Sequence, residues 1–285
     1  MSDIKVIEFE NKKYPKKLRK IKNPPQRLYV QGDIELLNKK GIAIVGSRNC
    51  TQYGIKWCEK LTKDLLEYNL VIISGMAKGI DSVAHNITIR NGMKTIAVLP
   101  SGFNNIYPKS NIQLYKNILK SGGAIVTEYE ENVVASSDKF LARNRIVSGL
   151  AIGTLVVEAG YRSGTSVTAS LTKEQGKKVF CIPGNLENSK SIGTNILIKK
   201  GAKLITSAED IAKNYHLVKC EKNEKNVEIP SEYEDIYNLI TEKPIDTLTI
   251  IKKSNLRVSE VMSKLTILEL EGKIKKVSGD KFMRL

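Results

Sequence analysis

The sequence predicts an α/β protein in which a doubly wound, mostly parallel sheet is followed by a small C-terminal domain of helices and a hairpin. Two observations support this fold class. Between residues 41 and 206, short runs of Val, Ile and Leu alternate with longer stretches of helical periodicity. Strand–helix alternation repeated this often is typical of a parallel sheet with helices on both faces. Beyond residue 231, three amphipathic stretches precede a short pair of strands.

The strand candidates are continuously apolar instead of alternating, which indicates burial on both faces. They are GIAIVG (41–46), LVIISG (70–75), KTIAVLP (94–100), AIVT (124–127), TLVVEA (154–159), KVFCIP (178–183) and KLIT (203–206). Between the first two, residues 54–68 place Trp57, Leu61 and Leu65 on one side of a helix. Ligands of such sheets lie beyond the carboxyl ends of the strands. The loops that follow the strands therefore form the candidate site.

The chain divides into four expected segments: a basic lead-in (1–40), the sheet domain (41–215), a charged linker (216–230) and a C-terminal domain (231–285). In the last segment the helices are expected at EYEDIYNLITEK (232–243), DTLTIIKKSN (246–255) and VSEVMSKLTILELEGK (258–273), with a hairpin over 273–285. Three helices and a hairpin form a winged-helix module, whose third helix usually enters the major groove of duplex DNA.

This third helix is a poor match for duplex DNA, because its outward positions include Ser259, Glu260, Ser263 and Glu269. A contact with protein, or at most a weak contact with DNA, is the favoured interpretation. The charge distribution agrees with it. The chain has a net charge of +16, of which +6 falls on residues 1–40, +9 on 41–215 and only +1 on 216–285. A polyanion is therefore expected on the first two segments, although a lysine-rich composition that only keeps the protein soluble is the alternative.

Composition excludes several classes of protein. The longest apolar runs are too short to cross a membrane, and the N-terminus lacks the pattern of a signal peptide. The four cysteines show no CxxC spacing and no histidine cluster, so we expect a cytoplasmic protein without a metal site or disulfide. No segment matches GxGxxG or GxxxxGK[ST], and two histidines leave little for acid–base chemistry. The sequence therefore predicts no cofactor and no enzymatic activity.

The loops after the strands are rich in glycine. They cover residues 46–48, 74–81, 100–108 and 158–166, with Arg48, Lys78 and Arg162 among them. Glycine allows close approach of the backbone, and free amides at a helix start favour phosphate. Convergence of these loops at one sheet edge predicts a phosphate-bearing ligand. In the second loop, Asp81 and His85 are four residues apart on one helix face, and a structural contact is favoured over a catalytic pair.

The stretch DKFLARNRIVSGL (138–150) concentrates cations beside an aromatic residue. Ser136, Ser137 and Asp138 are candidates for the N-cap of a helix. Lys139 and Arg143 then share one face, with Phe140 and Asn144 beside them, whereas Arg145 lies about 200° from Arg143. We therefore assign Arg143 to the ligand and expect Arg145 to pair with a carboxylate. Phe140 either stacks on a base of single-stranded nucleic acid or packs the entry of the helix.

Several runs of this chain resemble the DNA-processing protein A family (DprA, also called Smf). They are IVGSRNCTQYG (44–54), SGMAKGIDSVAH (74–85), TIAVLPSGFNNIYP (95–108), FLARNRIVSGLA (140–151), VVEAGYRSGTSVTASLTKEQGKKVFCIPG (156–184) and IGTNILIKKGAKLI (192–205). The resemblance covers nearly the whole chain. It implies an extended Rossmann-like domain that binds single-stranded DNA without sequence preference, forms a homodimer and helps to load the RecA recombinase onto incoming DNA during natural transformation. The family often carries a C-terminal winged helix.

Carried over position by position, the resemblance implies a DNA-binding pocket that includes the turn after the first strand, the SGMAKG loop, the basic helix and the loop at Gly164. The implied residues are Ser47, Arg48, Ser74, Gly75, Lys139, Phe140, Arg143, Gly164 and Thr165. In this pocket, amides near Ser74 and Gly75 would hold a phosphate.

Two other functions are less well supported by the sequence. The glycine-rich loops also resemble those of the nucleoside-monophosphate phosphoribohydrolases, enzymes with the motif PGGxGTxxE. In this chain the segment that follows Glu158 lacks the paired glycines and the later glutamate of that motif, which counts against this activity. A duplex-DNA regulator acting through the winged helix is disfavoured by the near-neutral charge of that domain.

Overall fold

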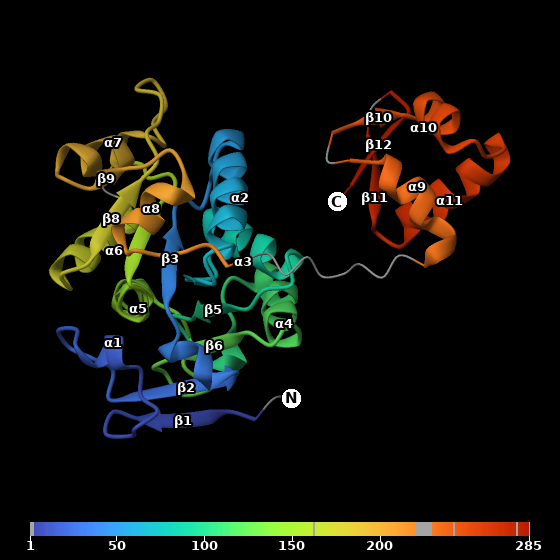
Figure 1. Cartoon of the computed structure of the whole chain (residues 1–285). Coiled ribbons are helices and arrows are strands. Elements are labelled where there is room, and N and C mark those ends of the chain that lie inside the picture. Colours follow the sequence, from blue (N-terminus) through green and yellow to red (C-terminus); the bar gives the residue numbers. More distant parts are fainter. Residues whose placement is uncertain (1–2, 162, 221–229, 242, 278, 285) are drawn as a thin grey trace. The chain divides into compact units, whose positions relative to one another are not determined.

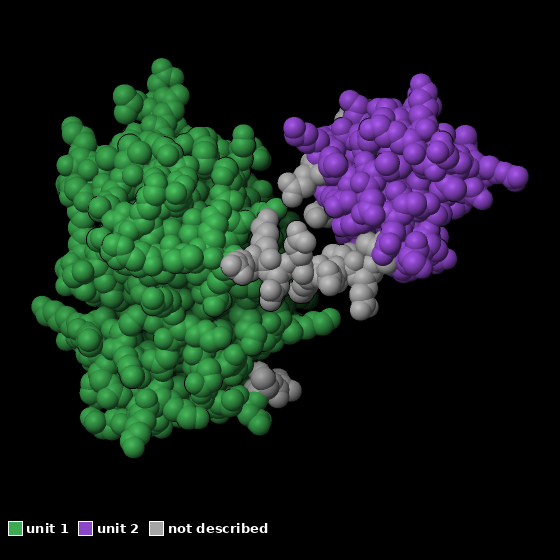
Figure 2. Space-filling view, viewed as in Figure 1, with its two compact units in different colours: residues 1–220 green, residues 221–285 purple. Residues whose placement is uncertain are grey.

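The computed structural model describes residues 3–161, 163–220, 230–241, 243–277 and 279–284. It contains two compact units, residues 1–220 and 221–285, which Figure 2 shows in different colours and whose elements Figure 1 labels. Each unit has a hydrophobic core of its own. Within the described residues, no helix is long and apolar enough to cross a membrane.

The first unit is built on a nine-stranded sheet with the order β1-β2-β6-β5-β4-β3-β7-β8-β9. Seven of its strands run parallel to one another. They are β3 (Gly41–Val45), β4 (Val71–Ser74), β5 (Thr95–Val98), β6 (Ala124–Thr127), β7 (Gly153–Val156), β8 (Lys178–Cys181) and β9 (Lys203–Leu204). These are the seven strands predicted from continuous apolar runs, so the doubly wound sheet is confirmed.

The first 40 residues belong to this sheet instead of forming a separate lead-in. Strand β1 (Lys5–Glu8) pairs antiparallel with β2 (Arg27–Gly32), which pairs antiparallel with β6. Between them, the short helix α1 (Lys16–Arg19) buries Leu18 completely. The 3₁₀ turn η1 (Ile34–Asn38) then leads into β3. The segment is basic on its surface, but its apolar side chains are part of the core of unit 1.

Helices cover both faces of the sheet (Figure 1). The longer ones are α2 (Gln52–Leu66), α3 (Ile80–Arg90), α4 (Ile112–Lys120), α5 (Ser137–Leu150), α6 (Gly164–Glu174), α7 (Ile192–Lys199) and α8 (Ala208–Asn214), and 3₁₀ turns occur at η2 (Phe103–Asn105) and η3 (Lys109–Asn111). Alternate strand residues divide between the faces. Ala43 and Val45 share a core with α5, α6 and α7, whereas Ile42 and Ile44 share a core with α2, α3 and α8.

The order of the strands reverses at β3. Chain progress from β3 runs through β4 and β5 to β6 on one side, and from β7 through β8 to β9 on the other. The loops after β3 and β7 therefore lead away in opposite directions and leave a crevice at the carboxyl ends of these two strands. Open α/β sheets bind their ligands at such a switch point. The fold thus selects one place along the sheet edge for a site.

The predicted structural role of Arg145 is confirmed. Its guanidinium binds both carboxylate oxygens of Glu128 at 2.6 and 2.7 Å, and its Nε donates to the main-chain oxygen of Asn23 at 3.0 Å. Both side chains of the ion pair are largely buried. Arg145 therefore connects α5 to the end of β6 and to the N-terminal segment.

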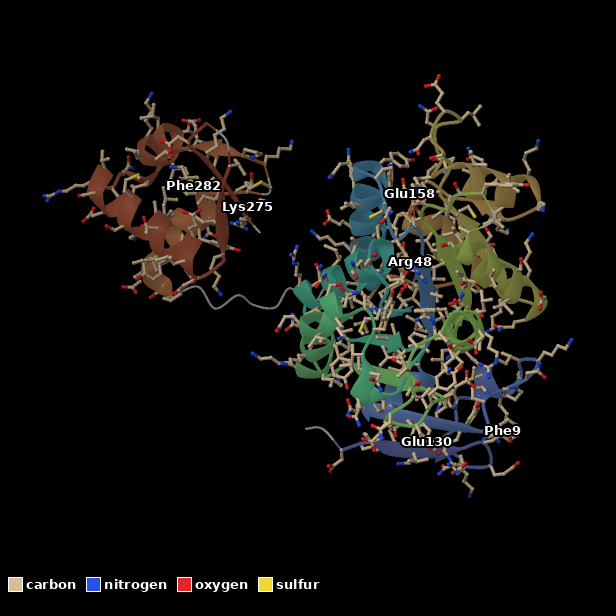
Figure 3. All side chains as sticks on the ribbon, turned by 180° about the vertical axis from the view of Figure 1, so that it is seen from behind. Phe9, Arg48, Glu130, Glu158, Lys275 and Phe282 are labelled. Atoms are coloured by element: carbon tan, nitrogen blue, oxygen red, sulfur yellow. The ribbon has the colours of Figure 1, made fainter. Side chains whose placement is uncertain are left out.

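The second unit is a winged helix, as the sequence predicts. It contains the turn η4 (Ser231–Tyr233), the helices α9 (Glu234–Leu239), α10 (Thr247–Ser254) and α11 (Val258–Leu270), and the strands β10 (Ile245–Asp246), β11 (Ile274–Val277) and β12 (Lys281–Arg284). The strand β10 was not predicted, and it pairs with β12 to complete a three-stranded sheet. Phe282 of the hairpin is buried in the core of this unit, and Lys275 points outward from it (Figure 3).

Candidate nucleic-acid interface

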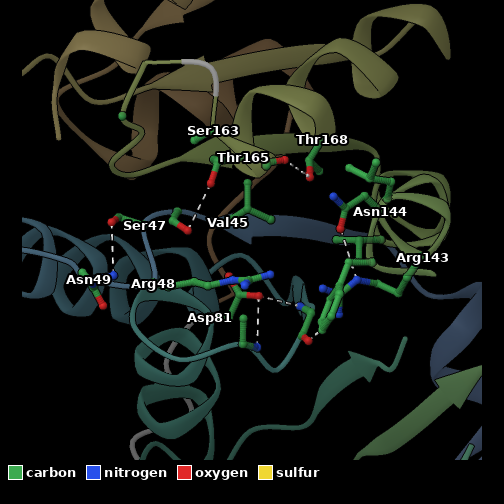
Figure 4. Close-up of a pocket in the computed structure, with 18 of the residues that line it drawn as sticks. Val45, Ser47, Arg48, Asn49, Asp81, Arg143, Asn144, Ser163, Thr165 and Thr168 are labelled. Atoms are coloured by element: carbon green, nitrogen blue, oxygen red, sulfur yellow. Dashed lines mark hydrogen bonds between the residues drawn. The ribbon is translucent and has the colours of Figure 1, made fainter. Parts of the chain in front are cut away.

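A pocket of about 730 Å³ opens at the switch point of the sheet. Its walls come from the loop after β3, the loop after β4, one face of α5 and the start of α6 (Figure 4). The lining residues are Val45, Gly46, Ser47, Arg48, Asn49, Gly75, Ala77, Asp81, Tyr107, Ser137, Phe140, Leu141, Arg143, Asn144, Val147, Gly160, Ser163, Gly164, Thr165, Thr168 and Lys190. Seven of the nine residues implied by the resemblance line this pocket, and Ser74 and Lys139 do not.

Arg48 and Phe140 lie against each other at this pocket. The exposed guanidinium of Arg48 lies over the Phe140 ring, 5.0 Å from its centroid. The turn that carries Arg48 is held by the start of α3, because the amide of Ile80 donates to the main-chain oxygen of Ser47 at 3.2 Å. Gly79 makes this close approach feasible: its φ is +77°, and a Cβ there would lie 2.2 Å from the same oxygen. The sequence pattern of cation beside aromatic is thus built from two distant segments.

Thr165 and Gly164 form the opposite wall at the first turn of α6. Thr165 donates its hydroxyl to the main-chain oxygen of Gly46 at 3.1 Å, which connects this helix start to the turn after β3. Gly164 is exposed, and a side chain there would meet open space. Main-chain amides at a helix start are suited to anionic groups. Arg162, which the sequence placed near this loop, lies outside the described residues.

Arg143 is buried, with only 4% of its surface exposed. Its Nη1 donates to the main-chain oxygens of Gly75 and Val98, the latter at 2.6 Å, and its Nε donates to the Asn144 side chain at 3.2 Å. Burial lowers the pKa of Arg143 to about 10, so the guanidinium remains a cation at neutral pH. Arg143 lines the pocket, but its guanidinium is hydrogen-bonded to main-chain oxygens at the ends of β4 and β5. Its role is therefore chiefly structural, which corrects its assignment to the ligand.

The amide of Gly75 is not available to a phosphate. One carboxylate oxygen of Asp81 accepts hydrogen bonds from the amides of Gly75 at 3.1 Å and Ala77 at 3.3 Å (Figure 4). Ser74 is fully buried and donates its hydroxyl to Ile44 at 2.6 Å. The expectation that this loop holds a phosphate through its amides therefore needs correction, because a carboxylate of the protein already fills that place.

Lys139 lies beside the pocket and is not one of its lining residues. Its ammonium donates to the hydroxyl of Ser136 at 2.9 Å and lies 5.9 Å from the ring centroid of Tyr129. Ser136 is the N-cap residue of α5, as predicted, but its hydroxyl contacts the side chain of Asp138 and not a main-chain amide. Lys139 therefore lies at the rim of the pocket.

Asp81 and His85 serve two different contacts. The Nδ1 atom of His85 lies 2.8 Å from the hydroxyl of Thr95, which itself donates to Ile72. Since the hydroxyl proton is committed, Nδ1 must be the protonated nitrogen and Nε2 the bare one. Burial lowers the pKa of His85 to about 3. Both side chains therefore make structural contacts, but with other residues than predicted, since the expected contact was between Asp81 and His85 themselves.

The buried histidine predicts a loss of stability in acid. In the unfolded chain His85 takes up a proton near pH 6.5, whereas in the folded chain it resists protonation down to about pH 3. The unfolded state therefore binds more protons between these pH values. As the pH is lowered through this range, the free energy of unfolding of unit 1 should fall by up to about 1.4 kcal/mol per pH unit. Denaturant titrations followed by the fluorescence of Trp57 would measure it.

The two histidines of the chain supply a matched comparison. His85→Gln should flatten the acid dependence, whereas His216→Gln, at an exposed position, should leave it unchanged. Burial raises the pKa of Asp81, which favours the folded state as the pH falls and is common to both variants. The same pH slope in all three proteins would contradict the prediction.

Several lining residues were not singled out in the sequence. Tyr107 makes an edge contact with Phe140 at 5.2 Å between ring centroids, and it is 46% exposed. Lys190 also lines the pocket. Tyr107 lies in a loop after a predicted strand, which was a usable signal. Lys190 comes from a loop with no motif of its own, so only the fold identifies it.

Glu158 makes a structural contact at the start of α2. It is 1% exposed and accepts hydrogen bonds from the main-chain amide and the hydroxyl of Thr51, the N-cap of α2. Figure 3 labels Glu158 and Arg48 in the same part of unit 1, with Glu130 and Phe9 near β1 and β2. Among the described residues, no group of three or more His, Cys, Asp or Glu could hold a metal ion.

The fold and the site together define a class: a Rossmann-like α/β protein with a cationic and aromatic pocket at its switch point, joined to a winged helix. Comparison with known families makes this specific. The model of the DNA recombination-mediator protein A family matches residues 5–216, and the DprA winged helix domain matches residues 222–280. The chain belongs to the DNA recombination-mediator protein A family, which confirms the resemblance noted in the sequence.

Individual relatives agree with this assignment. The chain is similar to Protein Smf of Escherichia coli K12, with 36% identity covering 96% of this chain and 76% of the relative. It is 41% identical to the DNA processing protein DprA of Streptococcus pneumoniae, over 70% of each protein. The X-ray structure of the latter superposes with a TM-score of 0.70 and 39% identity, over 74% of each chain.

A solved structure of DNA processing protein A from Helicobacter pylori also superposes on this chain. Its TM-score is 0.68 at 32% identity, over 75% of this chain and 96% of that one. That study concerns the single-stranded DNA binding mode of the Helicobacter protein.

Proposed function

We propose that this protein binds single-stranded DNA without sequence preference and acts as a recombination mediator, which helps to load RecA onto incoming strands during natural transformation. The observation that carries the proposal is the Arg48–Phe140 pair at the mouth of the switch-point pocket. A cation over an aromatic ring offers charge to a phosphate and an apolar surface to an unpaired base at the same place.

The distribution of charge and the related proteins also support single-stranded DNA as the ligand. Residues 1–215 carry nearly all of the net positive charge, and the Helicobacter relative binds single-stranded DNA. The groups that line the pocket are suited to phosphates and ring faces, which every nucleotide presents, and this favours binding independent of sequence. RecA and a second copy of the chain are the proposed partners, and the cytoplasm is the proposed location.

Within the proposed site the residues divide by position. Ser47, Arg48, Phe140, Gly164 and Thr165 line the accessible pocket and would contact the strand directly. The remaining implied residues lie deeper or at the rim, and we assign them supporting roles: Ser74, Gly75, Lys139 and Arg143.

The test is a comparison of oligo-dT with duplex DNA of equal length. Stacking contributes about 1–3 kcal/mol per base and needs an unpaired base, so we expect oligo-dT to bind at least about tenfold more tightly. Neutralisation of two or more phosphates predicts a slope of log K against log salt of about −1.4 or steeper. Fluorescence anisotropy at several salt concentrations measures both quantities. Equal affinity for the two ligands would exclude the proposed ligand.

A further inference from the structure

A second, smaller hollow of about 110 Å³ adjoins the main pocket. Most of its lining is shared with that pocket, namely Arg48, Gly75, Ala77, Tyr107 and Phe140. Lys78 and Pro108 complete it. The side chains of Arg48, Phe140 and Tyr107 therefore form a wall that lines both hollows.

The two aromatic rings of this wall are not equivalent. Phe140 is half-buried, the Arg48 guanidinium lies over its ring, and the Tyr107 ring makes an edge contact with it at an interplanar angle of 70°. Tyr107 is 46% exposed. Part of the Phe140 ring is thus in contact with protein neighbours, and Tyr107 offers a further, more accessible aromatic surface to a planar ligand.

The charge of the smaller hollow suits a nucleotide as well. Lys78 is exposed and lines this hollow together with Pro108 and Tyr107. An aromatic surface beside a single ammonium matches one base and its adjoining phosphate. The hollow is much larger than the roughly 10–15 Å³ that one water molecule requires.

We propose that this smaller hollow is a base-binding subsite, in which the nucleobase that follows the nucleotide in the main pocket stacks on Tyr107, and Lys78 neutralises the adjoining phosphate. The inference rests on the proposed function, because a base reaches this hollow only from a strand that crosses the Arg48–Phe140 pair. It adds Tyr107 and Lys78 to the residues that contact DNA.

The test uses two oligomers of about six nucleotides, near the lower end of known site sizes: oligo-dT and an abasic oligomer with the same number of phosphates. Tyr107→Leu should weaken binding of oligo-dT about tenfold and leave the abasic oligomer within twofold of wild type, because only a base loses its stacking partner. Tyr107→Phe keeps the ring and should bind both oligomers as wild type does.

Lys78→Ala supplies the complementary result. It should weaken both oligomers by the same factor and reduce the salt slope by about 0.7, the value for one phosphate of a single strand. Trp57 fluorescence during thermal unfolding checks that each variant is folded. Unchanged oligo-dT affinity in Tyr107→Leu, or equal weakening of both oligomers, would overturn the subsite. A wild-type protein that binds neither oligomer would instead overturn the proposed function.

Discussion

Replacement of Arg143 by methionine is expected to destabilise unit 1 by about 3–5 kcal/mol. The substitution removes a buried cation, and it leaves the main-chain oxygens of Gly75 and Val98 without their donor. The carboxylate of Asp81, also buried, loses the nearby positive charge that favours its ionised form. Leaving a buried charge without its compensating neighbour typically carries a penalty of this size. Urea titration followed by Trp57 fluorescence measures it for unit 1 alone.

Two further variants separate this effect from general disruption. Lys63→Met changes the same charge at an exposed position of α2 and should cost less than about 0.5 kcal/mol. Asp81→Asn combined with Arg143→Met should be less destabilised than the two single variants added together, because the unpaired carboxylate is gone. Strict additivity would show that the two groups do not act as a pair.

Replacement of Arg48 by glutamate is expected to weaken oligo-dT binding by about a hundredfold or more. The loss of a charge-assisted contact is worth about 1.5–3 kcal/mol, and a carboxylate next to a phosphate adds repulsion. Arg48 is exposed, and its guanidinium lies over the ring of Phe140 at the surface. Because the side chain is not part of the core, the fold should tolerate the change. Anisotropy titrations with labelled oligo-dT measure the affinity directly.

Lys63→Glu is the matched control, because it changes the net charge by the same amount. Lys63 lies about 16 Å along α2 from the first turn of that helix, at 1.5 Å per residue, and the first turn is the end near the pocket. We expect an effect of less than about threefold. Similar losses in both variants would mean that overall charge, and not a site at Arg48, determines binding.

The strands of the parallel sheet could be predicted because each is an unbroken apolar run. The strands β1 and β2 were missed for the opposite reason. In β1 only Ile7 is buried, and β2 begins with an exposed arginine. Such short segments carry little pattern, and the pairing of β2 with β6 joins residues about a hundred positions apart. Register over that distance is decided by tertiary contacts.

The site was predictable in kind more than in detail. Helical geometry correctly placed Arg143 and Arg145 on different sides of α5, and the partner expected for Arg145 proved to be Glu128. Depth was not accessible, because an arginine in the sequence does not reveal whether its guanidinium ends in water or against main-chain oxygens. Likewise, the acceptor for the amide of Gly75 proved to be Asp81, six residues later.

The contact between Asp81 and the loop after β4 has a consequence for the proposed binding of DNA, because it fixes the conformation of this loop. The side-chain amide of Asn111 also binds this loop, at the main-chain oxygen of Met76, a residue held at a φ of +55°. The loop is therefore ordered when the chain folds, and the loss of its conformational entropy occurs at that stage and not when DNA binds. A rigid receiving surface of this kind binds without a separate step of rearrangement, so its selectivity must come from the shape it already has.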